Sequence, residues 1–153
     1  MARIETALTR LFGIEHPILT APMSGIAGGA LANAVSHAGA LGVIGPGADA
    51  EAIRREVAAA GNARVAIGFI TWRLDRNPAA LDAALATGPV AIMLSFGNTA
   101  AYFARIKAAG TKIICQVQSL AMAREAADAG ADVIIAQGRD AGGHGGSARR
   151  GGR

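Results

Sequence analysis

Short runs of consecutive apolar residues recur along the chain, and each run after the first follows an Ala-rich stretch that ends in glycine. The runs are nearly continuous and rich in β-branched residues, which is typical of strands buried on both faces of a parallel sheet. The pattern therefore predicts six parallel strands. They lie at residues 17–20, 41–45, 65–70, 90–94, 112–117 and 132–136.

The stretches between the runs carry helix signals. Asn77-Pro78 is a helix-start signal, and Thr99 and Ser119 stand where N-caps belong. The glycines that end the stretches fit left-handed helix C-caps. Strands begin about every 20–25 residues, the spacing of strand–helix units rather than of hairpins. The expected helices are residues 4–12, packed at the bottom of the fold, and 29–38, 50–60, 79–86, 100–109 and 120–129.

Two α/β folds are built from such units. A doubly wound nucleotide fold needs a glycine fingerprint after a strand and an acid near the end of the second strand. Residues 25–29 match that fingerprint only loosely, and Gly45-Pro46-Gly47 contains no acid. A (β/α)8 TIM barrel instead gathers its functional residues at the carboxyl ends of the strands, where the unusual residues of this chain lie. We therefore expect an α/β fold of the (β/α)8 TIM-barrel type, truncated to about six β/α units.

Composition and charge narrow the possible partners. The chain has 153 residues, of which 52% are hydrophobic, so it can bury a core. The net charge is +4, but three arginines lie in the last five residues, and no basic stripe indicates a nucleic-acid interface. We expect a partial barrel domain over residues 1–146 and a basic Gly/Arg-rich tail over 147–153. With no leader peptide and no membrane-spanning stretch visible, we expect a cytoplasmic protein with no membrane partner.

The stretch from Gln137 to Gly146 carries the strongest chemical signal. A predicted strand delivers Gln137 to the functional end, and a glycine-rich loop then presents His144. Glycines let backbone approach a flat ligand closely, and a histidine can move protons near neutral pH. The same stretch is equally compatible with a mobile linker bearing a surface histidine. Asp140 and His144 lack a third ligand at suitable spacing, so we expect no metal site.

Four motifs resemble those of the nitronate monooxygenase (2-nitropropane dioxygenase) family, in the same order and spacing over about residues 3–146. They are Ala21–Gly25, Gly39–Gly42, Ile114–Gln118 and Ala136–His144, of which the last is the most specific. The wider family includes FMN-dependent enoyl-acyl-carrier-protein reductases and NADH:quinone reductases. The resemblance implies an FMN-dependent barrel oxidoreductase.

The resemblance also implies roles for particular residues. His144 would be the catalytic base, and Gln137 would hydrogen-bond the flavin. The implied cofactor-binding residues are Ala21, Pro22, Met23, Gln116, Gln137, Gly142 and Gly143. The chain departs from the family pattern at Gly68-Phe69-Ile70, where many members carry a polar, flavin-contacting residue, and it lacks the phosphate-binding loops after strands seven and eight.

Three functions stay open. The resemblance implies oxidation of alkyl nitronates or nitroalkanes by O2 to carbonyl compounds and nitrite, with His144 removing the α-proton of a neutral nitroalkane. An alternative is an NAD(P)H-dependent flavin reductase that acts on a quinone or an enoyl thioester. The third is a non-catalytic barrel remnant or assembly partner. Since an open sheet leaves unpaired edges, such a chain would form a homo-oligomer or join a complementing barrel fragment.

Overall fold

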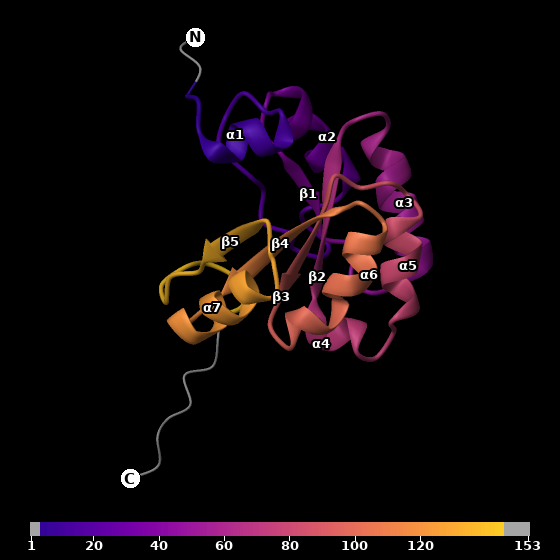
Figure 1. Cartoon of the computed structure of the whole chain (residues 1–153). Coiled ribbons are helices and arrows are strands. Elements are labelled where there is room, and N and C mark those ends of the chain that lie inside the picture. The colour runs from indigo at the N-terminus through magenta and orange to yellow at the C-terminus, as the bar shows by residue number, and fades with distance from the viewer. Residues whose placement is uncertain (1–3, 146–153) are drawn as a thin grey trace.

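The computed structural model describes residues 4–145 of the chain. The described residues form one parallel sheet in which the strands follow each other in chain order, β1 to β5 (Figure 1). In chain order the elements are α1 (Ala7–Phe12), α2 (Gly29–His37), β1 (Gly42–Ile44), α3 (Ala50–Ala60), β2 (Val65–Ile70), α4 (Thr71–Leu74), α5 (Ala79–Leu85), β3 (Ala91–Ser95), the 3-10 helix η1 (Thr99–Tyr102), α6 (Phe103–Ala108), β4 (Lys112–Val117), α7 (Leu120–Asp128) and β5 (Val133–Ala136).

Five of the six expected strands are confirmed with ends that differ by at most one residue. The strand expected at residues 17–20 was wrong. That segment forms only an isolated parallel bridge, between Leu19 and Leu41. Just beyond it, Val43 N donates to Thr20 Oγ1 at 2.7 Å, so a side chain replaces the backbone carbonyl that a strand would offer. The pairing therefore stops at Thr20, and the residues that follow cross over β1 and β2 instead of pairing with them.

The helices were also largely predicted. α3 begins and ends where expected, and the glycines after the five Ala-rich stretches all have φ between 61° and 88°. Ser119 caps α7, since its side chain accepts a hydrogen bond from Met122 N at 3.2 Å. The prediction for Thr99 was wrong: it opens the 3-10 helix η1, and the preceding Asn98 makes no side-chain cap. α4, which follows β2 without a cap, was not expected.

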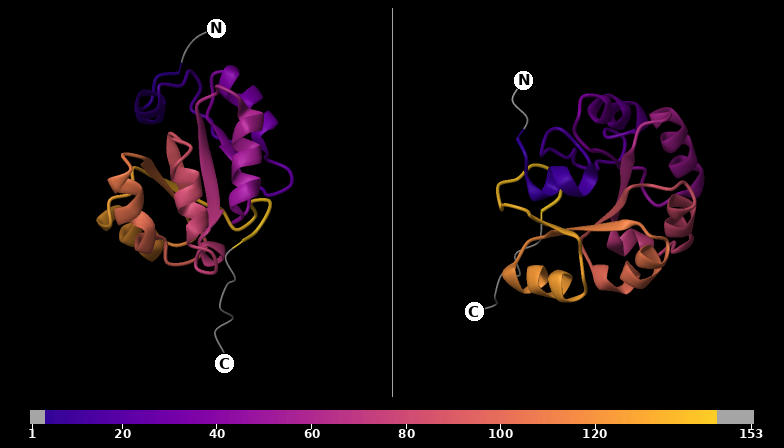
Figure 2. Two further views of the ribbon diagram at one scale, coloured as in Figure 1. Left: turned by 90° about the vertical axis from the view of Figure 1, so that its right-hand side faces the viewer. Right: turned by 45° about the horizontal axis from the view of Figure 1, so that its top comes forward.

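The two faces of the sheet have different neighbours. Helices cover its convex face, as both views of Figure 2 show. Strand residues such as Ile67, Ile92 and Ile113 pack there with helix residues such as Leu81 and Ile106. A second cluster fills the concave face, and alternate strand residues contribute to it. Its buried members are Phe12, Ile14, Leu41, Val43, Ala66, Ala91, Met93 and Ile114.

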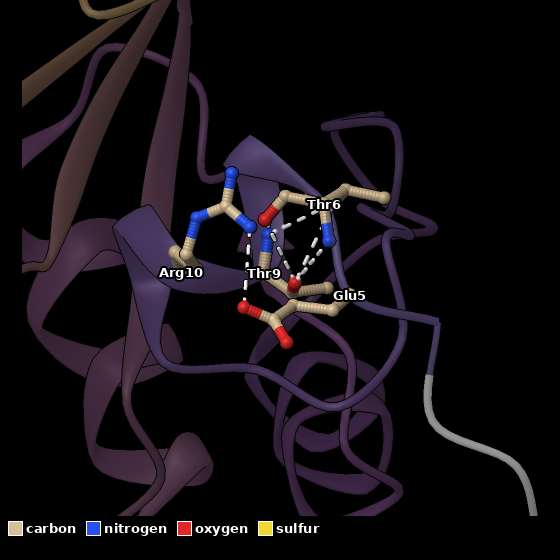
Figure 3. Close-up of polar contacts among 4 residues, drawn as sticks. All are labelled: Glu5, Thr6, Thr9 and Arg10. Carbon is tan, nitrogen blue, oxygen red and sulfur yellow. Dashed lines mark hydrogen bonds and ion pairs between the residues drawn. The ribbon is translucent and has the colours of Figure 1, made fainter.

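α1 closes the amino-terminal end of the concave face, as predicted for the leading helix. Phe12 belongs to the inner cluster, and Arg64, which precedes β2, donates from Nη1 to Phe12 O at 3.1 Å. A capping box starts α1 at residue 7 rather than 4: Thr6 Oγ1 accepts from Thr9 N at 3.2 Å, and Thr9 Oγ1 accepts from Thr6 N at 2.9 Å (Figure 3). Two backbone donors that the helix cannot satisfy itself are thereby paired.

Candidate functional site

The predicted site residues gather at the carboxyl ends of the strands, opposite the end that α1 closes. They fall into two groups. Ala21, Pro22 and Met23 lie beside β1 and β2, whereas Gln116, Gln137 and the glycine-rich loop lie at β4 and β5. Pro22 lies on the concave face, because a Cβ on Gly68 would meet both Pro22 and Val43 of the inner cluster.

The segment Ala21–Met23 crosses two glycines of the sheet at very short range. A Cβ on Gly68 would lie 2.3 Å from Pro22 Cβ, and a Cβ on Gly45 would lie 2.7 Å from Met23 N. Real Cβ atoms do not come so close, so both positions require glycine. The contact with Pro22 explains why no side chain fits at Gly68. Met23 is 42% exposed and leaves an apolar, polarizable surface at this end of the sheet.

Gln116 faces the concave side of the sheet. Its neighbours Cys115 and Val117 belong to the outer cluster and Ile114 to the inner one, so the alternation of the strand turns Gln116 inward. It is half-buried, and within residues 4–145 its side-chain amide has no hydrogen-bond partner. The amide is therefore free to bind a ligand above the inner cluster.

A chain of hydrogen bonds joins β4, β5 and the glycine-rich loop. Gln118 Nε2 donates to Gln137 Oε1 at 2.9 Å, and Gln137 Nε2 donates to the backbone oxygen of His144 at 2.7 Å. Each amide keeps one N–H and at least one oxygen lone pair for a further partner. Gln118 was missed among the site residues, although its position directly after β4 and two residues after Gln116 could have indicated it.

The imidazole of His144 is exposed and lies against Phe96, with 6.3 Å between ring centroids and an interplanar angle of 54°. Neither ring nitrogen has a hydrogen-bond partner in the part of the chain that the structure describes. Phe96, which follows β3, has φ of 58°, a left-handed conformation that is costly for a bulky residue. Such strain concentrates at functional sites. Its place at a strand end left two interpretations of Phe96 open, a pocket wall or a core residue, but nothing local in the sequence indicates its left-handed conformation.

Within the described chain, no close contact explains why the loop carries glycine at these positions. A Cβ on Gly138, Gly142, Gly143 or Gly145 would meet nothing within 4 Å. Packing against the rest of the described chain therefore does not require glycine at these four positions. The groups that this end of the sheet offers to a ligand are the amides of Gln116 and Gln137, the glycine backbone and the thioether of Met23.

Other titratable groups play no part in this cluster. Cys115 is buried in the outer cluster, and that burial raises the pKa of its thiol, which makes it a poor nucleophile. Residues 4–145 hold no group of three or more His, Cys, Asp or Glu side chains placed to bind a metal ion. Within the same residues, no helix combines the length and apolarity that a membrane span requires.

Comparison with known proteins places the whole arrangement in a family. The sequence model of the nitronate monooxygenase family matches residues 5–66 and 76–153. A (3aS,4S,5R,7aS)-5-hydroxy-7a-methyl-1-oxo-octahydro-1H-indene-4-carboxyl-CoA dehydrogenase from Mycobacterium tuberculosis is 35% identical over 151 residues, which cover 93% of this chain and 41% of the relative. A nitronate monooxygenase from Paraburkholderia phytofirmans is 30% identical over 180 residues, covering 90% of this chain and 49% of the relative.

Solved structures show the same likeness. The M276A variant of FabK from Thermotoga maritima superposes with a TM-score of 0.84 at 33% identity, covering 94% of this chain and 50% of that one. The predicted fold class, part of a parallel (β/α)8 barrel, is thereby confirmed. The chain spans about half the length of the relatives that it matches.

Proposed function

The chain belongs to the nitronate monooxygenase family, and from that membership we propose that it forms part of a flavin-dependent oxidoreductase with FMN at the carboxyl ends of its strands. The observation that carries the proposal is the hydrogen-bonded chain from Gln118 through Gln137 to His144. It fixes a polar edge and a potential base beside an open glycine loop, which is what a flavin site and its substrate require.

Particular residues would hold the cofactor. Met23 would lie against the isoalloxazine, and Gln137 would use its remaining amide hydrogen or lone pair on a polar edge of the ring. Gly142 and Gly143 would let the backbone approach the ring, because neither carries a Cβ and nothing lies within 4 Å of where one would be. When bound, FMN would accept two electrons from the organic substrate and pass them to O2.

The substrate that we propose is an alkyl nitronate or nitroalkane, which O2 converts to a carbonyl compound and nitrite. His144 would remove the α-proton of a neutral nitroalkane with a ring nitrogen that bonds to no other group within residues 4–145. A nitronate has already lost that proton and needs no base. Comparing the rates with a nitroalkane and with its nitronate therefore separates proton removal from the later steps.

The test compares His144→Ala with the unmodified protein, both saturated with added FMN, on nitroethane and on preformed ethylnitronate. We expect kcat/KM for nitroethane to fall on the order of 10²–10⁴-fold, with a much smaller change for the nitronate. His37→Ala serves as the matched control, because that exposed histidine lies at the opposite end of the sheet and contacts Asn33 O. Equal losses on both substrates would exclude His144 as the base.

A second candidate is a reductase or dehydrogenase that acts on a thioester or a quinone with NAD(P)H. The similarity to a carboxyl-CoA dehydrogenase and to FabK favours it. Anaerobic stopped-flow mixing distinguishes the two. Flavin reduction by ethylnitronate but not by NADH supports the monooxygenase, whereas rapid reduction by NADH with none by the nitronate would reject it.

A further inference from the structure

Phe96, directly after β3, adopts a backbone conformation that its side chain disfavours. Its φ is 58°, and among residues 4–145 every other residue with positive φ is a glycine. In this left-handed region the Cβ comes close to the following carbonyl oxygen, which costs a bulky residue free energy that a glycine does not lose. A strained conformation of this kind persists only where the surrounding structure enforces it.

Contacts on both sides of Phe96 enforce that conformation. The preceding Ser95 is buried, and its Oγ donates to Phe69 O at 3.3 Å. Trp72 N donates to Phe96 O at 3.4 Å, and a Cβ on the following Gly97 would lie 3.4 Å from the same nitrogen. The backbone around Phe96 is therefore fixed against the end of β2 and the beginning of α4.

Packing in the core does not explain why the strained residue is a phenylalanine. Its side chain is half-buried and belongs to none of the hydrophobic clusters that the described residues form. The ring lies instead against the imidazole of His144, with 6.3 Å between the centroids and 54° between the planes. Aromatic rings favour such tilted contacts. The strained backbone therefore serves a contact with the proposed base.

Other contacts hold the backbone of His144 but not its imidazole. Gln137 Nε2 donates to His144 O at 2.7 Å, which fixes the main chain. Residues 138–145 are exposed, and neither imidazole nitrogen has a hydrogen-bond partner within residues 4–145. The imidazole can therefore turn about χ1 and χ2, except where the ring of Phe96 blocks it.

We propose that Phe96 is a positioning residue for His144, and that its left-handed conformation is retained because it directs the ring against the imidazole. In the proposed reaction a ring nitrogen of His144 takes the α-proton, and the electron pair of the broken C–H bond moves onto the nitro group to give the nitronate. A base is effective only when its nitrogen is correctly oriented toward that proton. This inference rests on the proposed function and names the residue that orients its base.

The backbone strain is tested by comparing Phe96→Gly with Phe96→Ala in urea unfolding of the 153-residue chain. Both variants lack the ring, but only alanine keeps a Cβ in the left-handed region. Glycine usually destabilises a chain relative to alanine, whereas here we expect Phe96→Gly to unfold at a midpoint about 0.5 M higher. A midpoint for Phe96→Ala equal to or above that of Phe96→Gly would overturn the proposal.

The contact between the rings is tested by NMR of the imidazole protons of the three histidines, in the chain without flavin. An aromatic ring displaces the resonances of protons held against it. Phe96→Leu should therefore shift the His144 signals and leave those of His16 and His37 in place, while Phe96→Tyr, which keeps the ring, should shift them much less. Phe103→Leu is the matched control, because it removes a buried phenylalanine from the outer cluster and should leave the His144 signals unchanged. Unchanged His144 signals in Phe96→Leu would contradict the proposal.

The effect on the reaction is measured with each protein saturated with added FMN. We expect Phe96→Leu to lower kcat/KM for nitroethane about tenfold and to change that for ethylnitronate by less than about twofold, because only nitroethane needs the base. Phe96→Tyr should restore most of the nitroethane rate. Equal losses on the two substrates, which a general loss of structure would cause, would exclude a positioning role.

The unfolding and NMR measurements use neither flavin nor substrate, so they separate this inference from the proposed function. If the unmodified chain oxidised neither substrate, the monooxygenase function would fail. The urea midpoints and the His144 signals would then decide for or against Phe96 as the residue that orients the imidazole.

Discussion

Substituting Gly68 by alanine tests the close crossing of Pro22 over β2. The new Cβ would lie 2.3 Å from Pro22 Cβ and 2.4 Å from Pro22 Cγ, whereas carbon atoms in contact lie about 3.5–4.0 Å apart. One side must therefore move by about 1.2 Å, and neither a proline ring nor a strand backbone moves easily. Overpacking of this size costs about 1–3 kcal/mol.

The assay is urea unfolding of the 153-residue chain, followed by circular dichroism. Since the free energy of unfolding falls by about 1–3 kcal/mol per M of urea, we expect Gly68→Ala to lower the midpoint by about 1 M. Gly138→Ala is the matched control, because a Cβ there meets nothing within 4 Å and the midpoint should hardly change. Adding Pro22→Gly to the Gly68→Ala variant removes both clashing atoms and should recover part of the loss.

The reasoning would be refuted if Gly68→Ala and Gly138→Ala unfolded at the same midpoint. It would also be refuted if the effects of Gly68→Ala and Pro22→Gly were simply additive, because two residues in steric conflict must show coupling. Either result would mean that the segment of Pro22 does not lie against β2, and the proposed position of Met23 beside the flavin would fail with it.

Three further outcomes are expected. Thr6→Ala removes one side of the capping box at Thr9 and should destabilise the chain by about 1 kcal/mol, measured by thermal unfolding. Burial and the hydrogen bond to Asp75 raise the pKa of Tyr102 to about 12. The free energy of unfolding should therefore fall as the pH rises from about 10 to 12, and Tyr102→Phe should reduce that fall; absorbance at 295 nm follows this only tyrosine directly. Finally, the 153-residue chain alone should bind FMN only weakly, because within residues 4–145 β5 pairs with β4 alone and Ile134 is 37% exposed; a stoichiometric micromolar complex in a fluorescence titration would contradict this.

The sequence predicted the strands well because burial on both faces leaves long apolar runs, which are easy to recognise. The strand predicted at residues 17–20 was wrong, because the Thr20 hydroxyl accepts the hydrogen bond from Val43 N in place of a backbone carbonyl. The pattern of hydrophobic residues does not indicate such a replacement. α4 was missed because four residues without a cap carry no periodicity.

The candidate site was predictable only where one motif carries it. Gln137 and His144 stand in the same glycine-rich stretch and proved to be hydrogen-bonded to each other through the His144 backbone. Phe96 and Gly68 depend on neighbours that are distant in sequence. The ring of Phe96 contacts the ring of His144, and Pro22 occupies the space that a side chain at Gly68 would need. These contacts, and so the roles of Phe96 and Gly68, can be recognised only in the three-dimensional structure.

The strands β1 to β5 lie side by side in the sheet in the same order as along the chain. This order bears on how the molecule folds during synthesis. Each β-strand pairs with the one made just before it, so the sheet can grow on the ribosome without waiting for a distant segment. The inner cluster is the exception, since Phe12 and Ile14 share it with Ala91 and Ile114. The first helix to emerge therefore reaches its final packing only after β3 and β4 have been translated.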